Sequence, residues 1–136
     1  MTVGVVGGLL VLWWGDAYTR EMRPVYAVME AGEQGWGTEA TRLLHGIIAR
    51  SSDRRGLADR LLKEREGSLV AEGMVLAVRS GHPRVRAILR EHLADGRWNW
   101  GLAHNDELAR QLLGYVDGGT AETWVMRWVE ETPGGK

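Results

Sequence analysis

The sequence contains no cysteine, which excludes disulfide bridges, thiol nucleophiles and thiolate metal sites. It also contains no phenylalanine, so its 7 tryptophans supply aromatic volume that Phe normally shares. Lysine is scarce. The 17 basic residues comprise 2 Lys (Lys63 and Lys136) and 15 Arg. No apolar run reaches the about 20 residues that a membrane-spanning helix needs. The sequence therefore predicts no membrane span.

What remains is an ordinary globular composition. A chain of 136 residues, 44% hydrophobic and 26% charged, has the size and make-up of one domain with its own core. The formal net charge is −1, so the chain as a whole lacks the excess of positive charge that nucleic acids or anionic membranes attract. We expect a single globular domain over residues 1–136.

The first 15 residues form an apolar segment whose structure the sequence leaves open. Gly7-Gly8 lies between a Val-rich and a Leu-rich run, which favours a β-hairpin. A buried helix fits the same residues, because short apolar runs do not distinguish the two periods. The segment lacks a basic region before it and a small-residue cleavage site after it, so we expect a cytoplasmic protein.

A nucleotide-binding βαβ unit is a further interpretation of this start. Residues 3–8 would form the strand and the glycine turn, and a second strand would end at Glu30. Leu9 and Leu12 occupy the positions of the second and third glycines of that fingerprint. Their side chains would keep the backbone away from a pyrophosphate, so the pattern argues against this fold.

The rest of the chain has helical periodicity, broken by glycine, serine and proline. The sequence predicts a mainly α fold, a compact bundle of about six short helices, with α+β as the alternative because Gly73 and several Val allow a strand at 74–78. The residues expected to face inward include Met22, Val25, Ala40, Leu44, Leu93 and Trp124. Ser51-Ser52-Asp53 is expected to end one helix and cap the next. The predicted helical ranges are Asp16–Ala31, Thr38–Arg50, 53–66, 68–81, 83–96, 105–119 and 120–131.

The pattern of residues 105–131 predicts a helix, a tight turn and a second helix. Asn105 and Thr120 are expected to cap the two helices through side-chain oxygens. The run Glu107-Leu108-Ala109-Arg110, followed by Leu113-Gly114, is similar to the first helix of many DNA-binding helix-turn-helix units. The turn is longer than in those units, and the second helix has three Glu against one Arg, which suits an ordinary helical hairpin better than a DNA reader.

A basic segment and several tryptophans are the candidate binding residues. Positive charge is concentrated between residues 79 and 97, where few acidic residues offset it, and an acidic partner would be attracted there. Tryptophans beside arginines or on glycine loops can anchor a partner or stack on bases. The candidates are Arg79, Arg84, Arg86, Arg90, Arg97, Trp98, Trp100 and Trp36.

No catalytic or metal-binding motif is present in the sequence, and no cofactor is implied. If the protein is an enzyme, His104, Asp106 and Glu107 are the best candidates, because a histidine beside carboxylates can transfer protons. Asn105 belongs to the same polar cluster. A metal site from His92, His104 and Glu107 would need the fold to bring them together.

The sequence favours a small non-enzymatic binding or regulatory protein that acts through a surface containing Trp and Arg. Its expected partner is another macromolecule, a protein in the first instance, and the terminal helix also suits a homo-oligomer. One alternative is a nucleic-acid-binding protein that uses the Arg79–Arg97 segment and the 105–131 hairpin. The other alternative is a small enzyme or ligand binder centred on His104.

Overall fold

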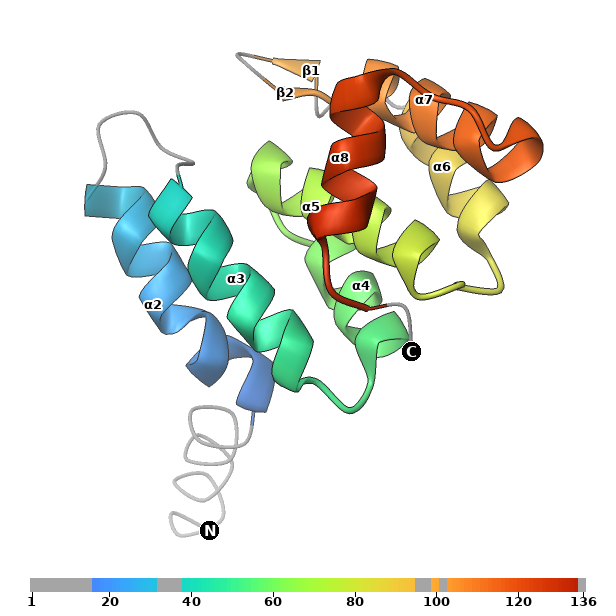
Figure 1. The fold of residues 1–136 in the computed structure, drawn as a ribbon. Coiled ribbons are helices and arrows are strands. Elements are labelled where there is room, and N and C mark those ends of the chain that lie inside the picture. Colours follow the sequence, from blue (N-terminus) through green and yellow to red (C-terminus); the bar gives the residue numbers. More distant parts are fainter. Residues whose placement is uncertain (1–15, 32–37, 95–98, 101–102, 135–136) are drawn as a thin grey trace, which may run out of the picture. The chain divides into compact units, whose positions relative to one another are not determined.

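A computed structural model describes residues 16–31, 38–94, 99–100 and 103–134 (Figure 1). The mainly α prediction is confirmed, and an α+β fold is not needed, because the two strands have two residues each. The expected β-hairpin at 3–14 lies outside the described residues. The described elements are α2 (Ala17–Ala31), α3 (Thr38–Arg50), α4 (Arg54–Leu62), α5 (Gly67–Arg79), α6 (Val85–Ala94), β1 (Asn99–Trp100), β2 (Ala103–His104), α7 (Asn105–Gly118) and α8 (Thr123–Glu131).

The chain divides into two compact units, Met1–Ile47 and Ile48–Lys136, which are described separately. In the first unit α2 and α3 run side by side (Figure 1). Met22 and Val25 of α2 are fully buried, as are Ala40 and Leu44 of α3. These are residues expected to face inward, and both helices begin within one residue of their predicted starts. The single domain expected over residues 1–136 stays a prediction.

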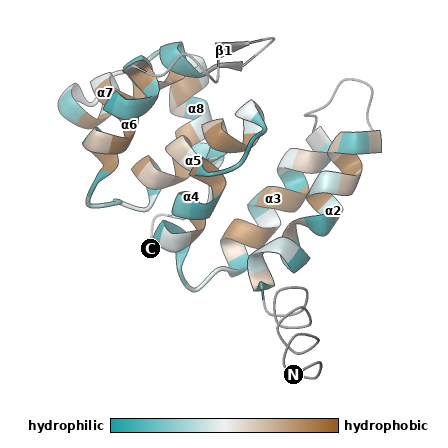
Figure 2. Ribbon diagram, turned by 180° about the vertical axis from the view of Figure 1, so that it is seen from behind, coloured by the Kyte–Doolittle hydropathy of each residue, from teal (hydrophilic) through white to brown (hydrophobic). Residues whose placement is uncertain are grey.

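The second unit is built around α5, which is buried along nine consecutive residues from Leu69 to Ala77. The helices α4, α6, α7 and α8 all pack against it (Figure 1). A helix that is apolar on all sides is stable only when it is enclosed in this way. Figure 2 shows that α6 and α7 carry both hydrophobic and hydrophilic residues, as helices with one buried face do.

Close approach of α4 to α5 depends on Gly73. A Cβ atom at this position would lie 3.0 Å from both the Leu61 Cβ and the Leu62 backbone nitrogen. Asp53 caps α4 as expected, because its side chain accepts the Gly56 N–H at 3.0 Å. The helix ends at Leu62 and not near residue 66 as predicted. The Glu66 carbonyl already accepts the N–H groups of the first turn of α5, so Glu66 belongs to the start of that helix.

In the C-terminal half, the exposure of Leu93 and the cap of α8 differ from the prediction, whereas the end of α7 agrees with it. Leu93 lies in the last turn of α6, beyond buried Ile88 and Leu89, and is 42% exposed instead of inward. Helix α7 ends at Gly118, within one residue of its predicted end, and the chain turns at Gly119, whose φ of 75° favours glycine. Thr120 does not cap α8, because the helix begins at Thr123 with Glu122 as its N-cap.

Trp124 is the second residue expected to face inward whose exposure the structure corrects. The buried stripe of α8 is centred on Val125 and Val129, whereas Trp124 is 45% exposed. At about 100° per residue, Trp124 points to the margin of this stripe, while Trp128 lies closer to its centre. Trp128 is accordingly packed against the core.

Residues 132–134, here called the C-terminal strap, return along α5. Thr132 is fully buried, and the Arg79 guanidinium donates through Nε to its carbonyl at 3.1 Å. The Thr132 hydroxyl donates to the Trp128 carbonyl at 2.8 Å. Gly134 lies so close to Leu76 that a Cβ would be 2.9 Å from its Cδ1 atom. The strap therefore forms part of the cover of α5.

We expect Gly73→Ala to destabilise the protein by about 1–3 kcal/mol, because the added methyl meets the backbone of α4, which cannot yield as a side-chain tip can. In an unobstructed helix the same change would stabilise by about 0.5–1 kcal/mol. Gly118→Ala is the matched control, since the nearest atom to its Cβ would be Thr120 Oγ1 at 3.8 Å. Urea unfolding measures both variants, and equal or greater stability of Gly73→Ala would contradict the close approach.

Candidate interaction surface

The basic segment predicted from the sequence does not form one uncompensated surface. Arg79 donates to the C-terminal strap, and the Arg86 guanidinium lies 2.6 Å from the Asp117 carboxylate of α7. Arg84 forms a longer ion pair with Glu91, at 4.0 Å. Arg90 is exposed on α6, and Arg97 lies outside the described residues. Three of these arginines therefore have acceptors within the protein.

One of the three tryptophans predicted as binding residues, Trp100, lies in a described strand. Trp36 and Trp98 lie outside the described residues. Trp100 belongs to β1, where it pairs with Ala103 of β2 in a short antiparallel ladder. The candidate binding role of these three tryptophans stays a prediction.

The polar cluster at residues 104–107 has structural contacts. His104 ends β2, opposite Asn99. Asn105 is the first residue of α7 and is 2% exposed, and its side-chain amide donates to the Gly67 carbonyl at 2.9 Å. This bond differs from the expected cap, in which the side-chain oxygen accepts, and it fixes the start of α7 to the start of α5.

The two acids of this cluster contact their own helix. The Asp106 carboxylate accepts the Glu107 N–H at 2.7 Å. Glu107 pairs with Arg110 and accepts the Gln111 side-chain amide at 3.1 Å. Within the described part of the chain, no group of three or more His, Asp or Glu residues is placed to hold a metal ion.

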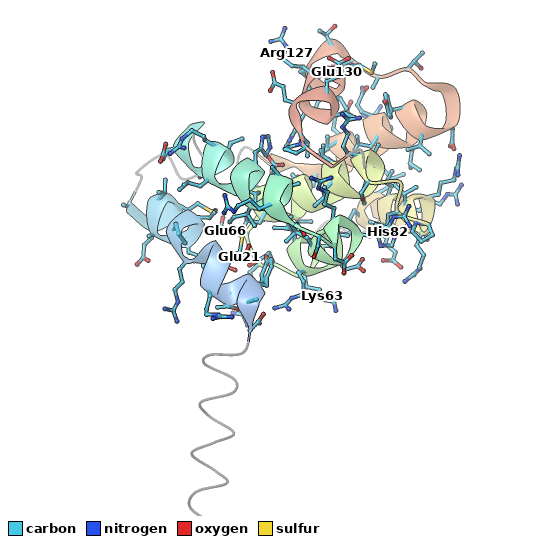
Figure 3. The ribbon with its side chains drawn as sticks, turned by 60° about the horizontal axis from the view of Figure 1, so that its bottom comes forward. Glu21, Lys63, Glu66, His82, Arg127 and Glu130 are labelled. Carbon is cyan, nitrogen blue, oxygen red and sulfur yellow. The ribbon has the colours of Figure 1, made fainter. Side chains whose placement is uncertain are left out.

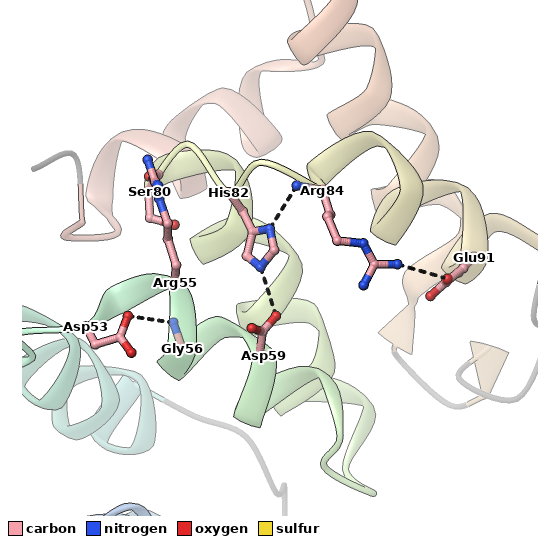
Figure 4. A network of polar contacts seen from close by, with 8 residues as sticks. All are labelled: Asp53, Arg55, Gly56, Asp59, Ser80, His82, Arg84 and Glu91. Atoms are coloured by element: carbon pink, nitrogen blue, oxygen red, sulfur yellow. Dashed lines mark hydrogen bonds and ion pairs between the residues drawn. The ribbon is translucent and has the colours of Figure 1, made fainter.

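A histidine that the sequence does not mark lies in the polar network of Figure 4. His82 is 7% exposed, and its Nε2 lies 2.9 Å from the Asp59 carboxylate. Its Nδ1 accepts the Arg84 backbone N–H at 3.0 Å, so the proton of the neutral ring is on Nε2 and points at Asp59. Both nitrogens are thus engaged, and neither is left for proton transfer or metal binding. The pair joins α4 to the turn before α6.

A second buried polar group is Glu72, in the middle of α5. It is 1% exposed, and its carboxylate accepts the indole N–H of Trp128 at 3.1 Å. A buried carboxylate requires such donors, because desolvation without them is costly. The bond ties α8 to the central helix and explains why Trp128 packs inward while Trp124 does not.

Among the described residues, an exposed tryptophan and several exposed charged side chains lie on the outward face of α8. Here Trp124 donates its indole N–H to the Glu122 carboxylate at 2.6 Å, which orients the ring while leaving it 45% exposed. Arg127 follows one turn later, and Figure 3 shows Arg127 and Glu130 projecting from the helix. A shallow hollow of about 570 Å³ is lined by Ala121, Glu122, Thr123, Trp124 and Arg127.

Comparisons with known proteins do not identify this surface. No protein-family model, curated protein or solved structure matches the chain. In the ranges that the structure describes, no helix is long and apolar enough to cross a membrane. The spacing of the apolar residues predicts Trp124 on the inward side of this helix and does not mark Arg127 as a binding residue, because their exposure depends on how α8 is rotated against α5.

We expect His82→Ala to lower the free energy of unfolding by about 1–3 kcal/mol. The Arg84 backbone N–H loses its acceptor, and the Asp59 carboxylate loses the hydrogen bond to the buried ring. Asp59→Ala should have a smaller effect, because the Asp59 side chain is 52% exposed and water can replace it. Urea unfolding near neutral pH compares the two. If His82→Ala were as stable as the unaltered protein, the bridging role of the histidine would be wrong.

Proposed function

We propose that the protein is a non-enzymatic interaction module that binds another macromolecule through the outward face of α8. The observation that carries the proposal is the orientation of Trp124, an exposed ring held by Glu122 beside Arg127. A ring that is already ordered loses little conformational freedom when a partner covers it. Tryptophan and arginine are also the residue types that most often contribute large parts of a binding free energy.

The charges of this face favour a protein over a nucleic acid. Its exposed acids are Glu122, Glu130 and Glu131, and Arg127 is the single base among the exposed residues from 122 to 131. A phosphate backbone would be repelled by such a surface, since counterion release by positive side chains supplies most non-specific affinity. A protein surface with an apolar group flanked by basic residues fits it better.

The second candidate is nucleic-acid binding through Arg79–Arg97 and the 105–131 hairpin. The acceptors already held by Arg79, Arg84 and Arg86 weaken it, because phosphates would have to displace them. No observation favours the third candidate, an enzyme centred on His104. The cytoplasmic location expected from the sequence stays a prediction.

We expect Trp124→Ala to weaken capture of a protein partner from lysate of the source cells by about tenfold or more. Arg127→Ala should weaken the capture less, because the Trp124 ring remains. Arg42→Ala is the control, since it removes an exposed arginine on α3, far in sequence from α8. The bait is immobilised full-length protein, and bound proteins are quantified by mass spectrometry with and without nuclease.

Equal capture by Trp124→Ala and the unaltered protein would contradict the role of α8. Loss of all capture on nuclease treatment would favour the nucleic-acid candidate instead. Thermal unfolding of each variant checks that its fold is retained.

A further inference from the structure

The turn between α5 and α6 is fastened on two sides by the ring of His82 (Figure 4). Its Nε2 lies 2.9 Å from the Asp59 carboxylate of α4, and its Nδ1 accepts the Arg84 backbone N–H at 3.0 Å. The backbone N–H of His82 donates to the Ala77 carbonyl at 2.9 Å, near the end of α5. One residue therefore connects α4, the end of α5 and the residue that precedes α6.

The hydrogen bond to Arg84 requires a neutral ring. Nδ1 can accept an N–H only while it carries no proton, so the single proton of the ring is on Nε2. His82 is buried and Nε2 already holds its proton, so a second proton can bind only at Nδ1. Two N–H groups then face each other across 3.0 Å, and the bond to Arg84 is lost.

The charges around the ring act in opposite directions. On α4, the Asp59 carboxylate favours the charged ring, whereas Arg55, which donates to the Ser80 carbonyl at 3.1 Å, adds positive charge nearby. The positive end of the α6 dipole also opposes a cation at this place. Asp59 is half exposed, so water and salt weaken its attraction without removing it. The ion pair therefore keeps the charged ring beside α4, and the loss falls on the bond to Arg84.

The other described charged groups beside this turn have partners of their own. The Arg84 guanidinium lies 4.0 Å from the Glu91 carboxylate of α6. Arg79, at the end of α5, donates to the C-terminal strap. Among the residues that the structure describes, Asp59 is thus the carboxylate that contacts the His82 ring.

We propose that His82 is a pH-sensitive switch for the turn formed by residues 81–84. Between about pH 8 and about pH 5, where histidine side chains change charge, the ring takes up a proton at Nδ1 and releases the Arg84 N–H. The ring stays on Asp59, so the turn remains attached to α4. Its side-chain attachment to the residue before α6 is lost, and the switch therefore acts on the beginning of that helix.

The backbone of this region confines the change to the turn. The Val85 N–H donates to the His82 carbonyl at 3.1 Å, and the Ile88 N–H donates to the Arg84 carbonyl at 2.9 Å. Neither bond involves the imidazole, so α6 keeps its own hydrogen bonds when the ring is charged. Gly81, with a φ of 66°, has the conformational freedom that lets the turn adjust.

NMR of the full chain between about pH 8 and about pH 5 tests the switch. The nitrogen chemical shifts of the His82 ring report its protonation. The protection factor of the Arg84 amide, which compares its hydrogen exchange with that of an unstructured peptide at the same pH, reports the bond. We expect this factor to fall by about tenfold, with the same midpoint as the ring. A charged ring with an unchanged Arg84 amide, or a ring that stays neutral throughout, would overturn the proposal.

Two variants separate the switch from other titrating groups. His82→Asn keeps a side-chain acceptor two residues before Arg84 that cannot be charged, so the Arg84 amide should no longer respond to pH. Asp59→Asn keeps an acceptor oxygen for Nε2 without the negative charge, so the midpoints of ring and amide should move together to lower pH. Glu91→Gln is the matched control, because it removes the acid that pairs with the Arg84 side chain and should leave both midpoints in place.

The variants can also refute the switch. An Arg84 amide that responds to pH equally in His82→Asn would assign the change to another group. Midpoints of ring and amide that separate in Asp59→Asn would show that the two events are not coupled. Either result would overturn the role proposed for His82.

Discussion

The enclosure of α5 is the constraint on which the second unit depends. Its residues from Leu69 to Ala77 are buried on every side, so each surrounding helix must present an apolar face at its own position around it. Two residues of α5 show what enclosure requires of individual side chains. Gly73 allows the backbone of α4 to approach, and Glu72 is stable in the interior with donors such as the Trp128 indole. Both requirements come from the position of α5 in the bundle.

Several polar side chains of the second unit join elements that are far apart in the sequence. Asn105 reaches 38 residues back to Gly67, and His82 reaches 23 residues back to Asp59. Arg79 bonds the strap, 53 residues further along the chain. In each case a buried hydrogen-bonding group needs a partner, and the nearest one belongs to a different helix. The outward groups of α8 differ because they are exposed and lie beside an ordered aromatic ring.

Local pattern was enough to predict the helices but not their contacts. The periodicity of Met22 and Val25, or of Leu44 and Ile48, identifies a buried face because it depends on neighbours three and four residues away. The cap at Asp53 is equally local. The exposure of Leu93 and Trp124 was not predicted. The spacing of apolar residues along a helix does not show which edge of its apolar face the other helices cover.

For the candidate site, residue type was informative and position was not. Tryptophan and arginine were expected to make the binding surface, yet the basic segment chosen from charge density has much of its charge bonded internally. The α8 face was hidden in the sequence because its tryptophan fits an inward stripe. Rotation of one helix by about 100° per residue decides between core and surface, and that rotation is set by Val125 and Val129 packing on α5.

The C-terminal strap also bears on how the protein is made. A ribosome delivers α5 long before α8 and residues 132–134, which complete its cover. During translation the most apolar helix of the unit is therefore exposed while some fifty residues are still being added, as the 53-residue separation of Arg79 and Thr132 implies. Exposed apolar segments of nascent chains attract chaperones and aggregate with one another. Synthesis that stalls before the strap leaves the cover of α5 unfinished, so the folding of this unit depends on a segment that is translated after all of its described helices.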